Sequence, residues 1–398
     1  MSDPQPLANY QYEIYLQGMA GKVPDLPLSF EGMQERAKGL LSSGAYGYVA
    51  GGAGTEQTVD ANRAALGRWD IVPRMMRDIG ERHLATELLG TSLPAPVLLA
   101  PVGVQSIVHR DGELASARAA AATGVPYIHS TAASHSIEQA AEQMGDAARW
   151  YQLYWPKDPE LAKSFLRRAE DAGYGAIVVT LDTWLLAWRP RDLQGAYLPF
   201  LHGEGIANYV SDPVFRASLE QTPEENMQAA VGQWIATYSD PTVTWENLAF
   251  LRESTKLPIL LKGILHPDDA RLAVEHGMDG IIVSNHGGRQ VDGAIATLDA
   301  LPEVVGAVPA DFPVLLDSGV RSGADAFKAL ALGARAVLLG RSYMWALACG
   351  GEAGVTAFLR GFLAELDLTL ALSGHTSFAE VGPEELRAAT HVRTKGRG

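Results

Sequence analysis

The chain has 398 residues, of which 47% are hydrophobic and 20% are charged, a composition typical of a globular protein with a substantial core. Its formal net charge of −14 argues against nucleic acids and anionic membranes as partners, although local arginines can still bind an anionic substrate. The single cysteine, Cys349, excludes an intramolecular disulfide and a cysteine-based metal site, and we expect no metal.

The N-terminal sequence predicts no targeting signal. Residues 1–20 lack a basic start followed by an apolar run, and no apolar stretch approaches membrane-spanning length. We therefore expect a soluble, cytoplasmic protein. Residues 1–45 are mixed and polar, with tyrosines at 10, 12 and 15, and predict an extension that packs on the body or on a neighbouring copy.

A tyrosine pair follows this extension. Tyr46 and Tyr48 run into a glycine- and alanine-rich stretch at residues 50–54, which suggests the end of a helix and a turn that presents a phenol. An aromatic staple with no functional role is the alternative explanation.

From residue 96 onward, short apolar runs alternate with helical patterns. This alternation, without a second compositional regime, predicts one α/β domain, a single (β/α)8 TIM barrel, over residues 46–385, followed by a C-terminal tail at 386–398. A doubly wound sheet is the alternative, but no G-x-G-x-x-G follows the first strand. The predicted strands are residues 96–101, 125–130, 149–154, 176–182, 258–262, 279–284, 312–317 and 336–340.

Residues 190–243 interrupt the alternation between the fourth and fifth strands. The segment is rich in Pro, Gly, Asn and aromatic residues, and a connection this long in a compact barrel is usually functional. We expect a lid that excludes water and holds product in place. Glu204, Asp212, Glu224 and Glu225 argue against a basic, apolar membrane anchor here.

In such a barrel the reactive side chains lie at the C-terminal ends of the strands. Those ends are mostly polar, although the strands that lead to them are apolar. The candidate residues at these ends, in chain order, are Pro101, Val102, Gly103, Ser130, Gln152, Tyr154, Thr180, Asp182, Lys262, Ser284, His286, Arg289, Asp317, Gly319, Arg321, Gly340 and Arg341.

The turn after the sixth strand carries His286 and Arg289, three residues apart. Histidine exchanges a proton near neutral pH, and arginine binds a carboxylate through two parallel hydrogen bonds. A base beside an anion clamp suits proton abstraction from a small acid. Taken alone, such a pair is more often structural, so the assignment depends on the other strand ends.

The ends of the seventh and eighth strands predict a phosphate site. Residues 317–321 and 340–341 would supply glycine N–H groups, two guanidiniums and the start of a helix, although solvated surface arginines are the alternative. Ser130, Gln152 and Thr180 could hydrogen-bond the edge of a flat heterocycle, and Lys262 could stabilise negative charge on it. Flavin mononucleotide (FMN) meets this description better than a nicotinamide.

Together these motifs resemble the FMN-dependent L-2-hydroxy acid oxidising family, which includes glycolate oxidase, lactate oxidase and lactate 2-monooxygenase. The resemblance runs from about Tyr46 to near Gly374. Within the family, the extension and residues 188–193 and 208–215 are most similar to lactate 2-monooxygenase. The motifs that carry the family resemblance are residues 152–154, 180–183, 261–263, 284–290, 317–321 and 340–341.

The resemblance implies a role for each polar group. His286 would be the general base, removing a proton as the electrons of the substrate α-C–H bond pass to the flavin, as hydride or after carbanion formation. Asp182 would orient that imidazole, and Lys262 would stabilise the reduced flavin. The residues that would bind the substrate carboxylate and its hydroxyl or developing carbonyl oxygen are Arg189, Arg289, Tyr48 and Tyr154.

The resemblance implies oxidation of L-lactate, or a close short-chain L-2-hydroxy acid, with FMN and O2. Gly103 stands where simple oxidases tend to carry alanine, which favours a lactate 2-monooxygenase that gives acetate, CO2 and water; local backbone geometry is the other explanation of this glycine. Two stretches depart from that enzyme, 217–240 in the lid and 290–293 after the sixth strand.

Three alternatives stay open. The first is an oxidase that releases the 2-keto acid and H2O2, the second an FMN-barrel isomerase, and the third a non-catalytic ligand-binding barrel. The resemblance further suggests a homotetramer or homo-octamer, with the N-terminal extension as a candidate contact.

Overall fold

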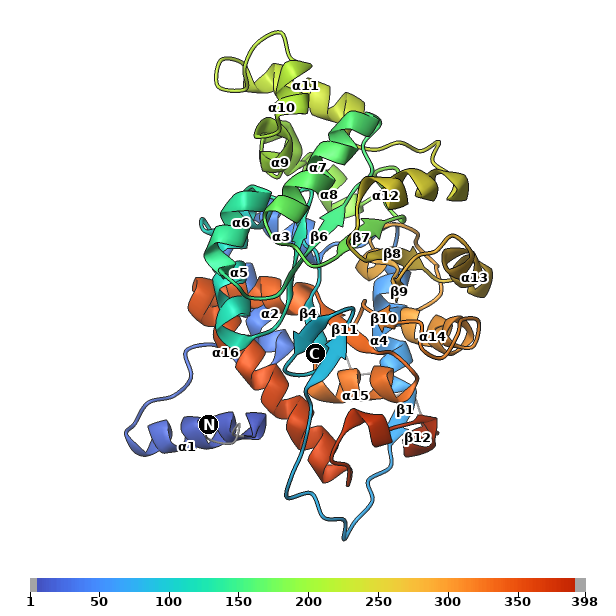
Figure 1. Ribbon diagram of the computed structural model, residues 1–398. Coiled ribbons are helices and arrows are strands. Elements are labelled where there is room, and N and C mark those ends of the chain that lie inside the picture. The colour runs from blue at the N-terminus through green and yellow to red at the C-terminus, as the bar shows by residue number, and fades with distance from the viewer. Residues whose placement is uncertain (1–5, 391–398) are drawn as a thin grey trace.

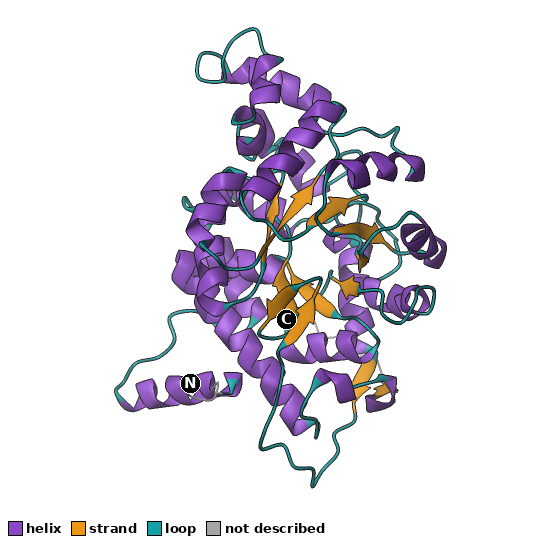
Figure 2. Cartoon of the chain, viewed as in Figure 1, coloured by secondary structure: helices purple, strands orange, loops and turns teal. Residues whose placement is uncertain are grey.

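The computed structural model describes residues 6–390, and within them the chain forms a closed barrel of eight parallel strands surrounded by helices (Figures 1 and 2). Each strand pairs with its neighbour in the chain, and β11 pairs with β4 to close the ring. The predicted (β/α)8 barrel is therefore confirmed, and the doubly wound alternative is wrong. The strands are β4 (Val97–Leu99), β5 (Tyr127–Ser130), β6 (Arg149–Leu153), β7 (Ile177–Thr180), β8 (Ile259–Ile264), β9 (Gly280–Val283), β10 (Val314–Leu316) and β11 (Ala336–Leu339).

Two apolar clusters follow from the alternation of side chains along each strand. One set points into the barrel and fills it, while the neighbouring residues, such as Val97, Leu99 and Tyr127, pack against the helices. Because both faces are apolar, polar side chains are concentrated where the strands end. The barrel-filling residues are Leu98, Ile128, Trp150, Val178, Leu260, Ile282, Leu315 and Leu338.

Four of the helices that cover the barrel begin at a residue whose side chain caps the helix. The side chain of Ser136 accepts a hydrogen bond from the backbone of Gln139, which completes a capping box, and Asp158 caps a helix that starts with Pro159. The covering helices are α5 (Gly112–Thr123), α6 (Ile137–Met144), α7 (Pro159–Asp171), α12 (Leu248–Ser254), α13 (Pro267–Glu275), α14 (Thr297–Val305), α15 (Gly323–Ala331) and α16 (Arg341–Leu372).

The N-terminal part contributes α1 (Tyr10–Met19), α2 (Phe30–Leu40), α3 (Ser43–Ala50) and α4 (Gln57–Gly67). In Figure 1, α1 lies at the edge of the molecule, at the lower left. It contacts α16, where the Arg360 guanidinium lies 4.1 Å from the centre of the Tyr10 ring and 2.6 Å from Glu13. The first five residues of the predicted extension lie outside the described residues.

Short strands lie outside the barrel. β1 (Trp69–Ile71) pairs antiparallel with β12 (Leu386–Ala388), so the predicted C-terminal tail starts with a strand, and its residues 391–398 lie outside the described part. The hairpin of β2 (Thr86–Leu88) and β3 (Thr91–Leu93) adds Leu88 and Leu93 to the barrel-filling cluster. In residues 6–390, every helix is too short or too polar to cross a membrane.

The segment 190–243 is folded into short helices: α8 (Pro190–Gln194), η3 (Pro199–His202), α9 (Ala207–Val210), α10 (Pro213–Ala217) and α11 (Met227–Thr237). The fully buried Asn208 donates hydrogen bonds to the carbonyls of Ser130 and Thr131, both at 3.0 Å. Asp212, also fully buried, accepts bonds from Ser164 and Arg168. These hydrogen bonds anchor the first half of the segment to the barrel.

Candidate active site

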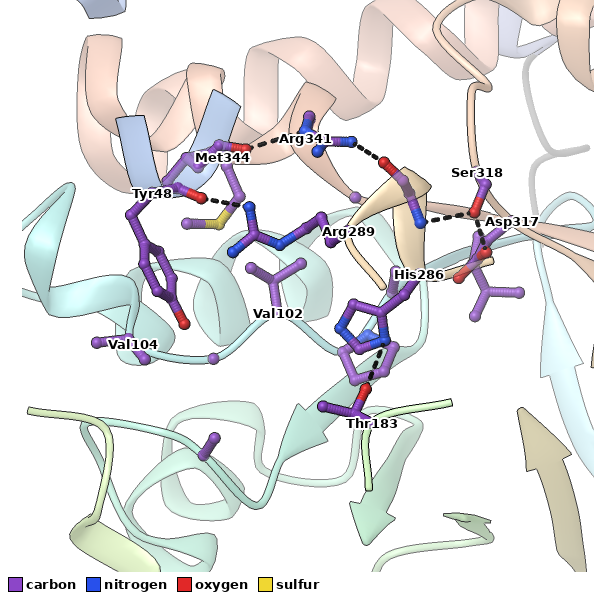
Figure 3. A pocket seen from close by; sticks show the side chains of 18 of the residues that line it. Tyr48, Val102, Val104, Thr183, His286, Arg289, Asp317, Ser318, Arg341 and Met344 are labelled. Atoms are coloured by element: carbon purple, nitrogen blue, oxygen red, sulfur yellow. Dashed lines mark hydrogen bonds between the residues drawn. The ribbon is translucent and has the colours of Figure 1, made fainter. Parts of the chain in front are cut away.

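A cavity opens at the C-terminal ends of the barrel strands (Figure 3). Most of the predicted site residues line it together, although they come from distant parts of the chain. Ser130, Gln152, Thr180 and Ser284 are buried at the same strand ends, and Asp182 contacts the cavity residue His286. The predicted residues that line the cavity are Tyr48, Pro101, Val102, Gly103, Tyr154, Arg189, Lys262, His286, Arg289, Asp317, Gly319, Arg321, Gly340 and Arg341.

His286 and Asp182 form a hydrogen-bonded pair. The His286 Nδ1 lies 2.7 Å from the Asp182 Oδ1, and the Thr183 hydroxyl donates to the same oxygen at 2.9 Å (Figure 3 shows Thr183 beside the imidazole). His286 has a φ of 56°, which is rare for a residue with a side chain and typical of functional sites. With its Nδ1 proton donated to Asp182, the ring keeps Nε2 as a proton acceptor.

The electrostatic environment fixes the charge of this pair. Burial lowers the pKa of His286, and the Asp182 charge offsets this lowering only in part, so the imidazole is neutral near pH 7. For Asp182, burial acts to raise the pKa, but the charges of His286 and Lys262 outweigh it and hold the pKa at about 2. The site therefore contains a neutral base beside an ionised carboxylate.

Two guanidiniums, Arg189 and Arg289, lie next to the pair. The Arg189 Nε donates to the Arg289 carbonyl at 3.0 Å, and Arg289 itself donates to the carbonyls of Tyr48 and Gly51, with its guanidinium 4.9 Å from the centre of the Tyr48 ring. Burial and the charge of Arg189 lower the pKa of Arg289 to about 10. Neither arginine forms an ion pair with a carboxylate within residues 6–390, so a substrate carboxylate would relieve their repulsion.

A second cationic cluster lies at the ends of β10 and β11. Arg341 donates to the carbonyls of Val49, Gly51 and Gly287 at 2.8–2.9 Å. Burial, followed by the charges of Arg289 and Arg321, lowers the pKa of Arg341 to about 9. A half-buried cluster of positive charge beside the glycines at 319 and 340 suits a phosphate group.

The buried polar groups at the strand ends next to the cavity suit a flat heterocycle. The Gln152 Nε2 is buried and has no hydrogen-bond partner among residues 6–390, while its Oε1 accepts from Ser130 at 2.9 Å. Lys262 donates to Ser284 at 2.8 Å and lies 3.3 Å from Asp317. Burial acts to lower the pKa of Lys262, but Asp317 and Asp182 raise it overall, so the amine stays charged. An unsatisfied donor and a fixed cation fit the edge of an isoalloxazine ring.

Gly103 lies where two backbone segments approach closely. A Cβ atom at this position would lie 2.4 Å from the Ala132 carbonyl oxygen, which also accepts a hydrogen bond from the Val104 N–H at 2.9 Å. Glycine is therefore required by the local packing of the loop after β4 against the loop after β5. The absence of a methyl group at 103 has this structural explanation, and it carries no weight in distinguishing a monooxygenase from an oxidase.

Three residues of the site were not predicted from the sequence. Thr183 bonds to both members of the acid–base pair, and the Gln290 side chain accepts from Arg189 at 2.6 Å. Tyr238, at the end of α11, brings into the cavity a buried phenol whose hydroxyl has no hydrogen-bond partner in the described part of the chain. Its ring stacks on Trp234 with the ring centres 5.0 Å apart. The aromatic content of the lid was the only signal for it, since residues 217–240 matched no motif.

Comparisons with known proteins agree with a site that binds FMN and a 2-hydroxy acid. The family model described as FMN-dependent dehydrogenase matches residues 37–388. An L-lactate oxidase of Lysinibacillus sphaericus is 44% identical over 384 residues, which are 96% of this chain and 97% of that protein. Human 2-hydroxyacid oxidase 1 is 43% identical over 345 residues, 86% of this chain and 91% of its own. A crystal structure of mandelate oxidase has a TM-score of 0.81 and 38% identity, and covers 92% of this chain and 99% of that one.

Proposed function

Because the chain belongs to the FMN-dependent dehydrogenase family and is an FMN-dependent 2-hydroxy acid oxidoreductase, we propose that it oxidises L-lactate, or a close short-chain L-2-hydroxy acid, with O2. The observation that carries the proposal is the His286–Asp182 pair beside Arg189 and Arg289 in one cavity. Oxidation of an α-hydroxy carboxylate requires a neutral base next to cationic groups that bind the carboxylate. His286 supplies the base, and Arg189 and Arg289 supply the cationic groups. L-lactate oxidases among the relatives support the choice of L-lactate.

FMN and the residues of the protein have separate roles in the reaction. FMN, when bound, accepts the two electrons of the substrate. Arg189 and Arg289 would fix the carboxylate, and the Nε2 of His286 would take the proton released during oxidation, while Asp182 stabilises the imidazolium that forms.

FMN itself would be held by groups from several strand ends. Arg321 and Arg341 would bind the phosphate, together with the N–H groups of the nearby glycines. The amide of Gln152 and the amine of Lys262 would meet the edge of the ring, where the positive charge favours the reduced, anionic form.

The fate of the product separates two forms of this activity. We propose the oxidase outcome, pyruvate and H2O2, because L-lactate oxidases are among the relatives. The second candidate is a lactate 2-monooxygenase, which the anchoring of the lid by Asn208 favours, since a closed site would hold pyruvate beside peroxide until it is decarboxylated. Turnover of isotopically labelled L-lactate in air decides between them. Pyruvate and H2O2 in equal amounts support the oxidase, whereas acetate and CO2 without free peroxide support the monooxygenase.

The pH profile of flavin reduction should report the base. Burial places the pKa of His286 below its ordinary value of 6.5, and only the neutral form accepts a proton, so kcat/KM should be constant above about pH 6.5 and fall at lower pH. In Asp182→Asn the carboxylate that raises this pKa is gone, so the acid limb should move to lower pH and the maximal rate should fall. Anaerobic stopped-flow measurements between about pH 5 and pH 8 test this. An acid limb at the same pH in both proteins would contradict it.

The proposed homotetramer or homo-octamer has a candidate contact on α1. Tyr12, Tyr15, Leu16 and Met19 follow an i, i+3, i+4, i+7 pattern and are 59–86% exposed, which is unusual for an amphipathic helix of a monomer. We expect Leu16→Asp to lower the mass measured by light scattering after size-exclusion chromatography. The matched control is Gln17→Asp, which adds the same charge outside the stripe and should leave the mass unchanged. A monomeric wild type, or an unchanged Leu16→Asp, would contradict the assignment.

A further inference from the structure

Gln290 links Arg189, which would bind the substrate carboxylate, to the segment that carries Asp182. Its Oε1 accepts a hydrogen bond from an Arg189 NH2 group at 2.6 Å, and its Nε2 donates to the Asp182 carbonyl at 2.6 Å and to the Leu185 carbonyl at 3.2 Å. One amide therefore connects the guanidinium assigned to the substrate with the backbone of the residue that holds His286. It is not among the residues that line the cavity, so it acts through Arg189.

The partners of Gln290 fix both its orientation and its residue type. The two carbonyls can only accept hydrogen bonds, and the guanidinium can only donate, so the amide has one orientation that satisfies all three contacts. A methionine of similar length could make none of them. A glutamate could accept from Arg189, but an ionised carboxylate would have no proton for the carbonyls of Asp182 and Leu185.

The Gln290 acceptor is uncharged, and this affects the two neighbouring guanidiniums. Arg189 and Arg289 lie side by side, and the charge of Arg189 contributes to lowering the pKa of Arg289, so the two guanidiniums repel each other. Arg189 is held in place by uncharged oxygens, namely the Gln290 amide and the Arg289 carbonyl. The pair is thus kept together without losing the positive charge that a substrate carboxylate would neutralise.

We propose that Gln290 is a positioning residue that sets the affinity of the site for the substrate carboxylate, an inference that rests on the proposed function. Its neutral amide oxygen orients Arg189, and its amide N–H groups fix the segment after β7. Two consequences follow. Loss of the amide should weaken carboxylate binding more than it slows the chemical step, and replacement by a carboxylate should weaken that binding further.

The test uses the FMN-loaded enzyme and the variants Gln290→Met and Gln290→Glu, with Gln228→Glu on the exposed surface of α11 as the control for added charge. Two quantities are measured: the dependence of anaerobic flavin reduction on L-lactate concentration, and the Kd of oxalate, a carboxylate without an α-C–H bond, from the change in flavin absorbance. We expect Gln290→Met to raise both the half-saturating L-lactate concentration and the oxalate Kd by about tenfold. The limiting rate of reduction should fall by less than about threefold.

Gln290→Glu distinguishes a positioning role from a merely structural role. At about pH 8 its oxalate Kd should rise by more than in Gln290→Met, because the carboxylate competes with the ligand for Arg189. This larger loss should persist down to about pH 5, because a carboxylate bonded to Arg189 beside Arg289 has a pKa below its ordinary value of about 4.3 and stays ionised. Oxalate Kd values equal to wild type, or a loss in Gln290→Glu no larger than that in Gln290→Met, would overturn the proposal. If L-lactate and its close analogues fail to reduce the wild-type flavin, the proposed function fails, while the oxalate titrations still decide the role of Gln290.

Discussion

His286→Asn should lower the limiting rate of flavin reduction by L-lactate by about 10²–10⁴-fold, the range that a positioned general base contributes. Asparagine is the appropriate replacement because it tolerates the left-handed backbone at this position, where φ is 56°, better than alanine does. It keeps a polar side chain near Asp182 but cannot accept the proton. The rate is measured by anaerobic stopped-flow spectroscopy at saturating L-lactate.

The control for this variant is His266→Asn, an exposed residue whose side chain caps α13. Asparagine also caps helices well, so both the rate and the thermal stability should match the wild type. Equal FMN content in all three proteins would show that the loss is not a loss of cofactor. A His286→Asn enzyme that reduces its flavin at the wild-type rate would contradict the assignment of the base.

Arg289→Met should lower kcat/KM for L-lactate by about 10²–10³-fold, because a charged group that binds the substrate carboxylate in a buried site is lost. Arg289→Lys separates charge from geometry. Lysine keeps the positive charge but presents no planar fork, so we expect it to recover only about tenfold of the loss. Steady-state and anaerobic rates at a series of L-lactate concentrations measure both effects.

Arg289 also donates to the carbonyls of Tyr48 and Gly51 at the end of α3, so its replacement could loosen that helix. Thermal unfolding of both variants checks this, and a melting temperature close to the wild type assigns the loss to substrate binding. Equal kcat/KM in Arg289→Met and the wild type would contradict a role for this guanidinium in the site.

The barrel could be predicted because its signals are local. Each strand is a short apolar run, and Ser136, Asp158 and Ser322 mark helix starts through hydrogen bonds to residues two or three positions later. The position of the site could be predicted for a related reason. Once parallel strands close into a ring, their C-terminal ends meet at one rim, so His286 and Arg341 become neighbours of the same cavity.

The features that were missed depend on contacts between distant segments. The requirement for glycine at 103 could be anticipated only as an effect of local backbone geometry, because it is imposed by the Ala132 carbonyl, whose approach is a property of two packed loops. Tyr238 reaches the cavity because it follows α11 and its ring stacks on Trp234 of that helix. No periodic pattern in the sequence indicates this packing. The link between Gln290 and Arg189 likewise joins two turns that are adjacent only in the closed barrel.

The direct test of the account is an anaerobic titration of the purified, FMN-containing protein with L-lactate. Oxidation of the substrate at this site predicts that the flavin absorbance is bleached by about one equivalent of L-lactate and returns when air is admitted, with pyruvate or acetate formed in the same amount. An isomerase or a non-catalytic barrel would bind the acid without this change. A flavin spectrum that stays oxidised with L-lactate and with its short-chain L-2-hydroxy acid analogues would contradict the proposed function.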